Sequence, residues 1–331
     1  MDGIGKLTNE ELKSIILSGI TPNRGDVLLR PGVGVDCGAI RTGGRVCVFS
    51  SDPITAAAAD AGRLAVHVSA NDVAAAGAEP VGLLLTILAP PGTPPARLTE
   101  LVAQAQEESA RLHIEILGGH TEYTDAVTRV VLSSTAIGLA PDNGRVFSAM
   151  GARPGDELVL SKWAGLEGTA ILASDYPEQV GQWLTSEELA FARSLADKIS
   201  VVPEGRIASQ LSVTAMHDVT EGGVLGAAWE MAEASGCGIR LERERIPVLA
   251  VTRKLCEGAG LDPYRLISSG CLLMAAVNGR QIVRSLVAKG IEAAVIGTFV
   301  EGPSVLRVGE QEQPLAPRAA DELYRFLRGK G

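Results

Sequence analysis

Acidic residues beside small residues and turns are the groups in this sequence best suited to binding a metal ion. Asp36 lies in a glycine-rich segment, Asp52 follows the β-branched residues 45–51, and Asp72 follows Asn71 in an alanine-rich segment. Such carboxylates suit Mg²⁺, which takes oxygen ligands and is commonly held by one or two carboxylates together with substrate phosphates. Asp36 and Asp52 could equally be ordinary turn residues. Asp72 is harder to explain in this way, because a carboxylate in an apolar helix requires a metal ion or a basic partner.

Two further segments combine glycines with polar side chains. Residues 118–122 (Gly-Gly-His-Thr-Glu) follow a predicted strand, and their glycines would let the backbone approach phosphate groups closely. A hairpin turn with a polar tip explains this segment equally well. Residues 217–223 (His-Asp-Val-Thr-Glu-Gly-Gly) lead from a predicted strand into a predicted helix. Asp218 and Glu221 are binding candidates there, although Asp218 or Thr220 could simply cap the helix.

Several familiar signatures are missing from the sequence. It contains no Gly-x4-Gly-Lys-Ser/Thr segment, which excludes a P-loop. Residues 32–38 look like a dinucleotide fingerprint, but the segment is one residue too long and is followed by a strand pattern rather than a helix. Neither zinc-type histidine spacing nor a Gly-x-Ser-x-Gly elbow occurs. We therefore expect His67 and His113 to be structural.

The composition narrows the class of protein. A chain of 331 residues is long enough for two domains of about 150 residues each. The net charge of −9 opposes binding to nucleic acid. The five cysteines are odd in number and include no Cys-x-x-Cys pair, which favours a reducing cytoplasm. The longest apolar stretch, residues 82–90, is about half as long as a membrane span requires. We predict a cytoplasmic protein that binds neither nucleic acid nor membrane.

The elements that position these residues follow an α/β (α+β) pattern, with β-branched segments alternating with alanine-rich segments of helical length. Strands are predicted at 45–51, 81–88, 114–117, 128–139, up to 217, 271–277 and 293–298, and helices at 60–76, 94–112, 167–174, 186–199, 204–211, 221–235 and 281–289. A capping box at Thr8 opens a short helix that stops at Gly19. Turn signals at 141–144 and 153–156 bracket a short strand and a boundary. We predict domains at 1–145 and 146–331.

Read in order, the chemical segments resemble the superfamily of aminoimidazole ribonucleotide synthetase (PurM), which also contains thiamine-monophosphate kinase, selenophosphate synthetase and the hydrogenase maturation protein HypE. The resemblance covers nearly the whole chain and is closest to HypE-like proteins known only as related to aminoimidazole ribonucleotide synthetase. It rests on residues 34–37, 50–52, 71–72 with 77–80, 118–122, 151–156 and 217–223. Six segments in the family's order are far more specific than any one of them.

The resemblance implies a PurM-like N-terminal domain whose strands close a β-barrel with those of a second subunit in a homodimer, and a C-terminal α+β domain beside the nucleotide. It implies ATP and Mg²⁺ as cofactors, with Asp36, Asp52, Asp72 and Asp218 holding the metal. The ATP-binding residues would be Asp36, Ser51, Asp52, Asn71, Asp72, Gly118, Gly119, Thr121, Asp218 and Glu221. His120 and Glu122 would be catalytic. Family members transfer a phosphoryl group to an oxygen or selenium nucleophile, mainly by positioning and charge neutralisation.

Three departures from the family's pattern bear on the reaction. His120 stands where kinase and HypE members carry aspartate, so Glu122 takes over an acidic role or one metal site is lost. HypE proper ends in a cysteine that carries the group being dehydrated, whereas the last cysteine here is Cys271. The reactive cysteine of selenophosphate synthetases has no counterpart in residues 1–30.

The leading functional hypothesis is an ATP-dependent enzyme of the HypE-like branch that phosphorylates an oxygen of a small substrate or of a partner's carboxamide. A small-molecule kinase resembling thiamine-monophosphate kinase is the second hypothesis. The third is a maturation or regulatory protein that binds ATP and a maturation partner without turnover, and the replacement at His120 favours it. The resemblance does not identify the phosphoryl acceptor.

Overall fold

The first half of the chain forms a six-stranded sheet. The computed structural model describes residues 7–54, 60–317 and 320–328. The strands are β1 (Val27–Leu29), β2 (Gly38–Thr42), β3 (Arg45–Ile54), β4 (Glu79–Ala89), β5 (Glu115–Tyr123) and β6 (Val131–Leu139), in the spatial order β1-β2-β3-β6-β4-β5. β4 and β5 are parallel and the other neighbours are antiparallel. β5 is therefore an edge strand, far from β3 in the sheet.

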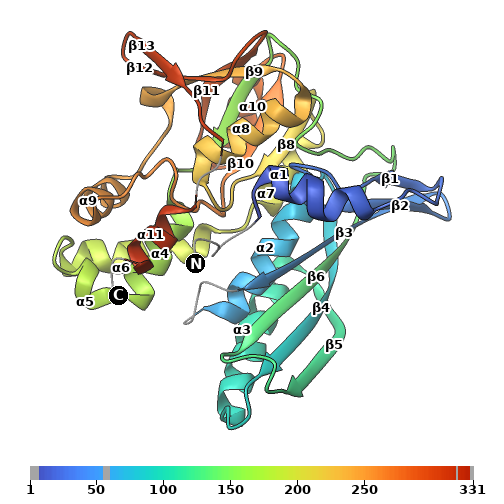
Figure 1. The fold of residues 1–331 in the computed structure, drawn as a ribbon, viewed down its shortest axis with the longest axis vertical. Coiled ribbons are helices and arrows are strands. Elements are labelled where there is room, and N and C mark those ends of the chain that lie inside the picture. Colours follow the sequence, from blue (N-terminus) through green and yellow to red (C-terminus); the bar gives the residue numbers. More distant parts are fainter. Residues whose placement is uncertain (1–6, 55–59, 318–319, 329–331) are drawn as a thin grey trace.

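Two helices pack against this sheet. The alanine-rich α2 (Ala61–Ala75) contacts β3, β6 and β4, and α3 (Pro95–Leu112) contacts α2 and β5. Nearly every side chain of α2 is buried, because this helix also contacts β8 and α7 of the second half of the chain. It runs through the centre of the molecule, between the first sheet and the rest of the chain (Figure 1). The small side chains that the sequence places here allow this close approach on both sides.

The second half contains a seven-stranded sheet. Its strands are β7 (Glu157–Ser161), β8 (Val213–Asp218), β9 (Gly238–Glu242), β10 (Leu272–Ala276), β11 (Ala293–Val300), β12 (Val305–Val308) and β13 (Gln311–Pro314), in the order β13-β12-β9-β11-β7-β10-β8. β12 pairs with β9 in parallel and the other neighbours are antiparallel. β8 is the edge strand of this sheet, and it lies against α2.

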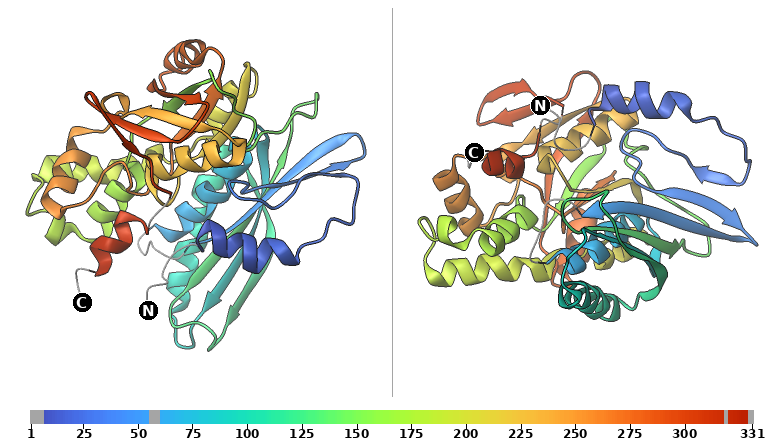
Figure 2. Two further views of the ribbon diagram at one scale, coloured as in Figure 1. Left: turned by 45° about the horizontal axis from the view of Figure 1, so that its top comes forward. Right: turned by 60° about the horizontal axis from the view of Figure 1, so that its bottom comes forward.

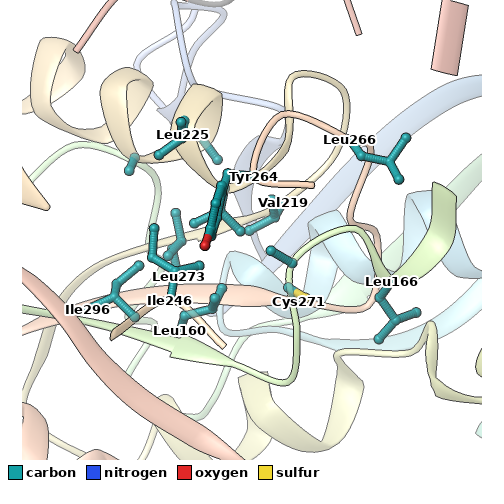
Figure 3. Close-up of a cluster of buried hydrophobic side chains, with 14 of the residues drawn as sticks. Leu160, Leu166, Val219, Leu225, Ile246, Tyr264, Leu266, Cys271, Leu273 and Ile296 are labelled. Atoms are coloured by element: carbon teal, nitrogen blue, oxygen red, sulfur yellow. The ribbon is translucent and has the colours of Figure 1, made fainter. Parts of the chain in front are cut away.

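Further helices lie in the second half of the chain. They are α4 (Leu166–Asp175), α5 (Pro177–Val180), α6 (Ser186–Ser194), α7 (Val202–Ala208), α8 (Gly223–Ser235), α9 (Ala250–Ala259), α10 (Gly279–Val287) and α11 (Glu322–Arg328). α4, α5 and α6 gather on the side of the molecule opposite β1 and β2 (Figure 2). The buried core of the second half includes Leu160 and Leu273 from the sheet, Leu225 from α8, and Tyr264 (Figure 3).

Polar contacts connect the two halves of the chain at α2. The Asn71 side chain donates to the carbonyl of Ile199 (2.8 Å) and accepts from the backbone N–H of Val201 (2.8 Å). Arg63 forms an ion pair with Asp197 at 3.0 Å. These contacts hold α2, which carries Asp72, in a fixed position against the second half of the chain.

The two-sheet α/β architecture confirms the predicted fold class. The capping box at Thr8 is also confirmed: it opens α1 (Asn9–Glu11), which continues as η1 (Leu12–Ile16) and η2 (Leu17–Gly19). Two predictions about strands are wrong. The segment between the turns at 141–144 and 153–156 contains no strand, and the strand predicted at 114–117 continues through the two glycines to Tyr123.

The structure offers no candidate for a membrane span: within its described ranges, every helix is too short or too polar to cross a bilayer.

Candidate metal centre

Four aspartates from different elements meet between the two sheets. Asp36 precedes β2, Asp52 lies on β3, Asp72 lies on α2, and Asp218 is the last residue of β8. The sequence predicted all four as metal ligands. The Ser50 hydroxyl contacts both Asp52 and Asp72, and Asp36, Asp72 and Asp218 line one pocket, so the four carboxyl groups form one cluster.

Ser50 links three of these positions. Its hydroxyl lies 2.5 Å from Asp72 Oδ2, 3.1 Å from Asp52 Oδ2 and 3.3 Å from the backbone carbonyl of Asp36. Ser50 and Asp52 are two residues apart on β3, so their side chains point to the same face, toward α2. The serine predicted to bind ATP was the neighbouring Ser51. Ser51 points to the opposite face, where its hydroxyl pairs with that of Thr135 at 2.8 Å.

The environment of Asp72 makes a negative charge there unfavourable. Burial raises its pKa well above the ordinary value, and the charges of Asp218, Asp52 and Asp36 raise it further. Within the part of the chain that the structure describes, no lysine or arginine forms an ion pair with Asp72. A bound cation would neutralise this repulsion, so the carboxylate cluster has the chemistry of a divalent-metal site.

His217 adds a ring nitrogen to the cluster. Its Nδ1 lies 3.4 Å from Asp36 Oδ2 and 3.8 Å from Asp218 Oδ1, and its Nε2 lies 3.3 Å from Glu230 Oε2 on α8. Burial opposes protonation of the imidazole, but the hydrogen bond with Glu230 and the charges of Asp36, Glu230 and Asp218 raise its pKa to about 9. His217 lies in the segment 217–223 but was predicted to have no role of its own, and nothing in the sequence indicated Glu230.

A small pocket opens at this cluster. Its lining includes Asp36, Asp72, His217 and Asp218 together with the thiol of Cys37. Burial raises the pKa of Cys37 well above its usual value, and the four surrounding aspartates add to this effect. The thiol therefore remains protonated and is poorly suited to act as a nucleophile.

Two other residues predicted to bind ATP have side chains that are hydrogen-bonded to other groups of the protein. Asn71 is buried, and both ends of its amide are bound to the backbone at Ile199 and Val201, so it has a structural role. Glu221 lies in the turn after Asp218 and accepts a hydrogen bond from the hydroxyl of Tyr324 on α11 at 3.0 Å.

Residues 118–122 lie on the exposed edge strand β5, apart from the aspartates. The register aligns Asp52 with Ser134 on β6, Ser134 with Leu85 on β4, and Leu85 with Gly119 on β5. Three strand spacings separate Asp52 from Gly119, a distance of about 14 Å. Gly118, Thr121, His120 and Glu122 share this strand, and His120 Nε2 lies 3.3 Å from Glu122 Oε2. Within one subunit, these predicted residues do not join the aspartate cluster.

Glu167 is another buried acid, and it lies outside the carboxylate cluster and was not predicted. It is 4% exposed on α4 and accepts a hydrogen bond from the backbone N–H of Ser269 at 3.3 Å. Burial raises its pKa to about 7, although the Ser269 hydrogen bond acts in the opposite direction. Its neighbours in the sequence, Leu166 and Gly168, gave no signal of this environment.

Glu167→Gln should stabilise the protein at pH 8 but not at pH 5. The folded protein holds this proton more tightly than the unfolded chain, so the contribution of Glu167 to stability falls as the pH rises from 4.5 toward 7. Removing the charge should raise the free energy of unfolding at pH 8 by about 3 kcal/mol. Chemical denaturation at both pH values measures this, with the exposed Glu187→Gln as control. An equal change at both pH values would contradict the assignment.

Comparison with known proteins agrees with this architecture. The N-terminal domain model of the AIR synthase related proteins matches residues 34–140, and the C-terminal domain model matches residues 153–309. A putative hydrogenase expression/formation protein of Methanocaldococcus jannaschii is 31% identical over 82% of this chain and 80% of that protein.

Solved structures show the same fold. The carbamoyl dehydratase HypE of Escherichia coli is 31% identical over 78% of this chain and 76% of that protein. Its crystal structure superposes with a TM-score of 0.71 at 27% identity, covering 85% of this chain and 88% of that one. A HypE structure in complex with ATP shares the fold at 20% identity, with a TM-score of 0.68 over 97% of both chains. Because the two domain models match most of the chain, and relatives over most of its length are 31% identical, the chain belongs to the AIR synthase related family.

Proposed function

We propose that this protein is an ATP- and Mg²⁺-dependent enzyme of the HypE-like branch, which transfers the γ-phosphoryl group of ATP to an oxygen of a small substrate or of a partner protein's carboxamide. The observation that carries the proposal is the cluster of Asp36, Asp52, Asp72 and Asp218, four carboxylates that two halves of the chain bring together. The family relatives named carbamoyl dehydratases, and the HypE structure in complex with ATP, support the same reaction class.

The aspartates would hold Mg²⁺, whose oxygen preference they match. When bound, the ion would supply positive charge beside the phosphates, which favours phosphoryl transfer. Ser50 would fix the carboxylate orientations, because its hydroxyl already contacts both Asp52 and Asp72. Since Asp218 comes from the second half of the chain, the contacts at α2 would set its distance from the other three. We retain residues 1–145 and 146–331 as the proposed domains.

A homodimer would explain the placement of residues 118–122. These residues cannot reach the aspartates of their own subunit, but a second copy could supply Gly118, Gly119, Thr121 and the catalytic candidates His120 and Glu122. The first sheet presents apolar side chains for such contact: Phe49 is 37% exposed and Leu84 is 39% exposed. β5 also has an unpaired edge, which favours pairing with another chain.

Leu84→Asp should convert the dimer to a monomer, because it places a charge in the proposed apolar contact between the six-stranded sheets of the two subunits. Size-exclusion chromatography with light scattering measures the mass directly. Val287→Asp is the matched control, since Val287 is an exposed apolar residue on α10 of the other domain and should leave the dimer intact. A wild-type protein that is monomeric at micromolar concentration, or a Leu84→Asp variant that stays dimeric, would refute this arrangement.

Phosphorus NMR of the reaction tests the activity. The protein is incubated with ATP, Mg²⁺ and a series of small carboxamides, alone or with a maturation partner protein. Acceptor-dependent release of ADP and free phosphate supports phosphorylation of an oxygen that then leaves. A stable phosphorylated product would instead show a kinase, and ATP binding without turnover under all these conditions would show a nucleotide-binding regulatory protein.

A further inference from the structure

The turn between β8 and α8 is held by side chains from the far end of the chain. Asp321, which is 2% exposed and directly precedes α11, accepts a hydrogen bond from the backbone N–H of Gly222 at 2.6 Å. The hydroxyl of Tyr324 on α11 donates to Glu221 Oε1 at 3.0 Å. This turn begins one residue after Asp218, so the start of α11 is bound to the segment that carries one of the four aspartates.

Asp321 joins three separate segments through its two carboxylate oxygens. Its Oδ1 accepts from the backbone N–H of Leu323 at 2.8 Å and from that of Ile267 at 3.2 Å, while its Oδ2 binds Gly222. The Leu323 contact is the usual capping bond of a residue that precedes a helix. A cap does not explain the other two contacts, which reach the turn after β8 and the loop before β10.

The turn depends on these contacts because its own backbone is adaptable. Gly222 has a φ of +84° and Gly223 has a φ of +61°, so both lie in the left-handed region that glycine adopts readily, together with many other conformations. The N–H of Val219 donates to the carbonyl of Cys271 at 3.0 Å, which fixes the start of the turn. The side chains at the start of α11 fix its end.

We propose that Asp321 and Tyr324 are positioning residues for metal and nucleotide binding: they hold the turn that follows Asp218 and so keep this carboxylate facing the other three. The inference rests on the proposed function, because it concerns how one ligand of that site is held. Both side chains would act through the turn, since they are bonded to Gly222 and Glu221. A displacement of about 1 Å in a binding group is enough to weaken a site strongly.

Isothermal titration calorimetry of the full chain with a non-hydrolysable ATP analogue, at a series of Mg²⁺ concentrations, tests the proposal. Asp321→Asn keeps the shape of the side chain but turns one acceptor oxygen into a donor, so it cannot accept all three N–H groups. It should weaken binding about 10-fold at low Mg²⁺. Tyr324→Phe removes only a hydroxyl and should weaken binding about 3-fold. Raising the Mg²⁺ concentration should restore the affinity of both variants, because mass action refills a site that holds its ion less tightly.

Glu322→Gln is the matched control. Glu322 is the next residue in the chain and is also buried, but its carboxylate accepts from the backbone N–H of Asp262 at 3.2 Å instead of from the turn. This variant should bind the analogue as wild type does. Tyr324→Phe keeps the test decisive if Asp321→Asn folds poorly, because the aromatic ring stays in place.

Three results would overturn the inference alone. They are binding by Tyr324→Phe and folded Asp321→Asn as tight as that of wild type at every Mg²⁺ concentration, equal weakening in Glu322→Gln, and a loss of affinity that added Mg²⁺ does not restore. Failure of the wild type itself to bind the analogue in Mg²⁺ would overturn the proposed function, and this inference with it.

Discussion

Asp72→Asn should raise the thermal stability of the metal-free protein and abolish its stabilisation by ATP with Mg²⁺. Burial and three neighbouring carboxylates raise the pKa of Asp72. The folded state therefore binds this proton more tightly than the unfolded state, and stability falls as the pH rises above the ordinary aspartate range. Asparagine has nearly the same shape and carries no charge, so it removes this cost. It also removes a carboxylate from the metal site, which should weaken Mg²⁺-dependent ATP binding about 100-fold or more.

Differential scanning fluorimetry at pH 8, with and without ATP and Mg²⁺, separates the two effects. Wild type should melt at a lower temperature than the variant without ligand and should gain stability when ATP and Mg²⁺ are added together. Asp125→Asn is the charge-matched control, because Asp125 lies in an exposed turn after β5. A variant that is less stable than wild type without ligand, yet is stabilised equally by ATP and Mg²⁺, would contradict the assignment of Asp72.

Gly119→Ala should destabilise the pairing of β4 with β5 by more than about 2 kcal/mol. A Cβ atom added at Gly119 would lie 1.7 Å from the carbonyl oxygen of Leu85, which is far closer than non-bonded atoms approach. That oxygen belongs to the backbone of β4, so relief requires the edge strand to move. We expect a lower midpoint of urea denaturation, together with loss of the dimer if β5 contributes to it.

Gly118→Ala provides a sharp control for this prediction. Gly118 and Gly119 share a backbone φ of +148°, but a Cβ atom at Gly118 would meet no atom within 4 Å. The two variants therefore share the same strained φ, and only Gly119→Ala adds the clash with Leu85. Equal destabilisation of both variants would show that backbone conformation, rather than close packing, explains the glycine pair.

Much of the fold could be predicted from the sequence, because local residue patterns indicate the helices and several strands. The alanine-rich segment predicted at 60–76 is α2 (Ala61–Ala75), and the helix predicted at 94–112 is α3 (Pro95–Leu112). The hairpin turn considered for the glycine pair was wrong, because both glycines lie within β5, where Gly119 packs against the backbone of Leu85 on β4. Strands β9, β12 and β13 were missed. β9 pairs with β11 and β12, which are distant in the sequence, so no local pattern specifies it, whereas β12 and β13 form a short hairpin with each other.

In the candidate site, too, some residues were indicated by the local sequence and others were not. The four aspartates were identified from their order along the chain, and the structure brings them together. Ser50 was available in principle, because strand alternation places it on the same face as Asp52, whereas Ser51 points away. Glu230 could not have been predicted from the sequence, because its contact with His217 depends on how α8 packs beside β8. Asn71 was assigned to ATP because it adjoins Asp72, but its amide is bound to the second half of the chain.

Isothermal titration calorimetry of the wild-type protein with a non-hydrolysable ATP analogue tests the central claim most directly. The claim is that carboxylates from both halves of the chain bind ATP through a divalent metal. We predict saturable binding in Mg²⁺ that disappears in EDTA and in both Asp72→Asn and Asp218→Asn, which remove one carboxylate from each half. Binding of equal strength in EDTA, or in either variant, would contradict the claim.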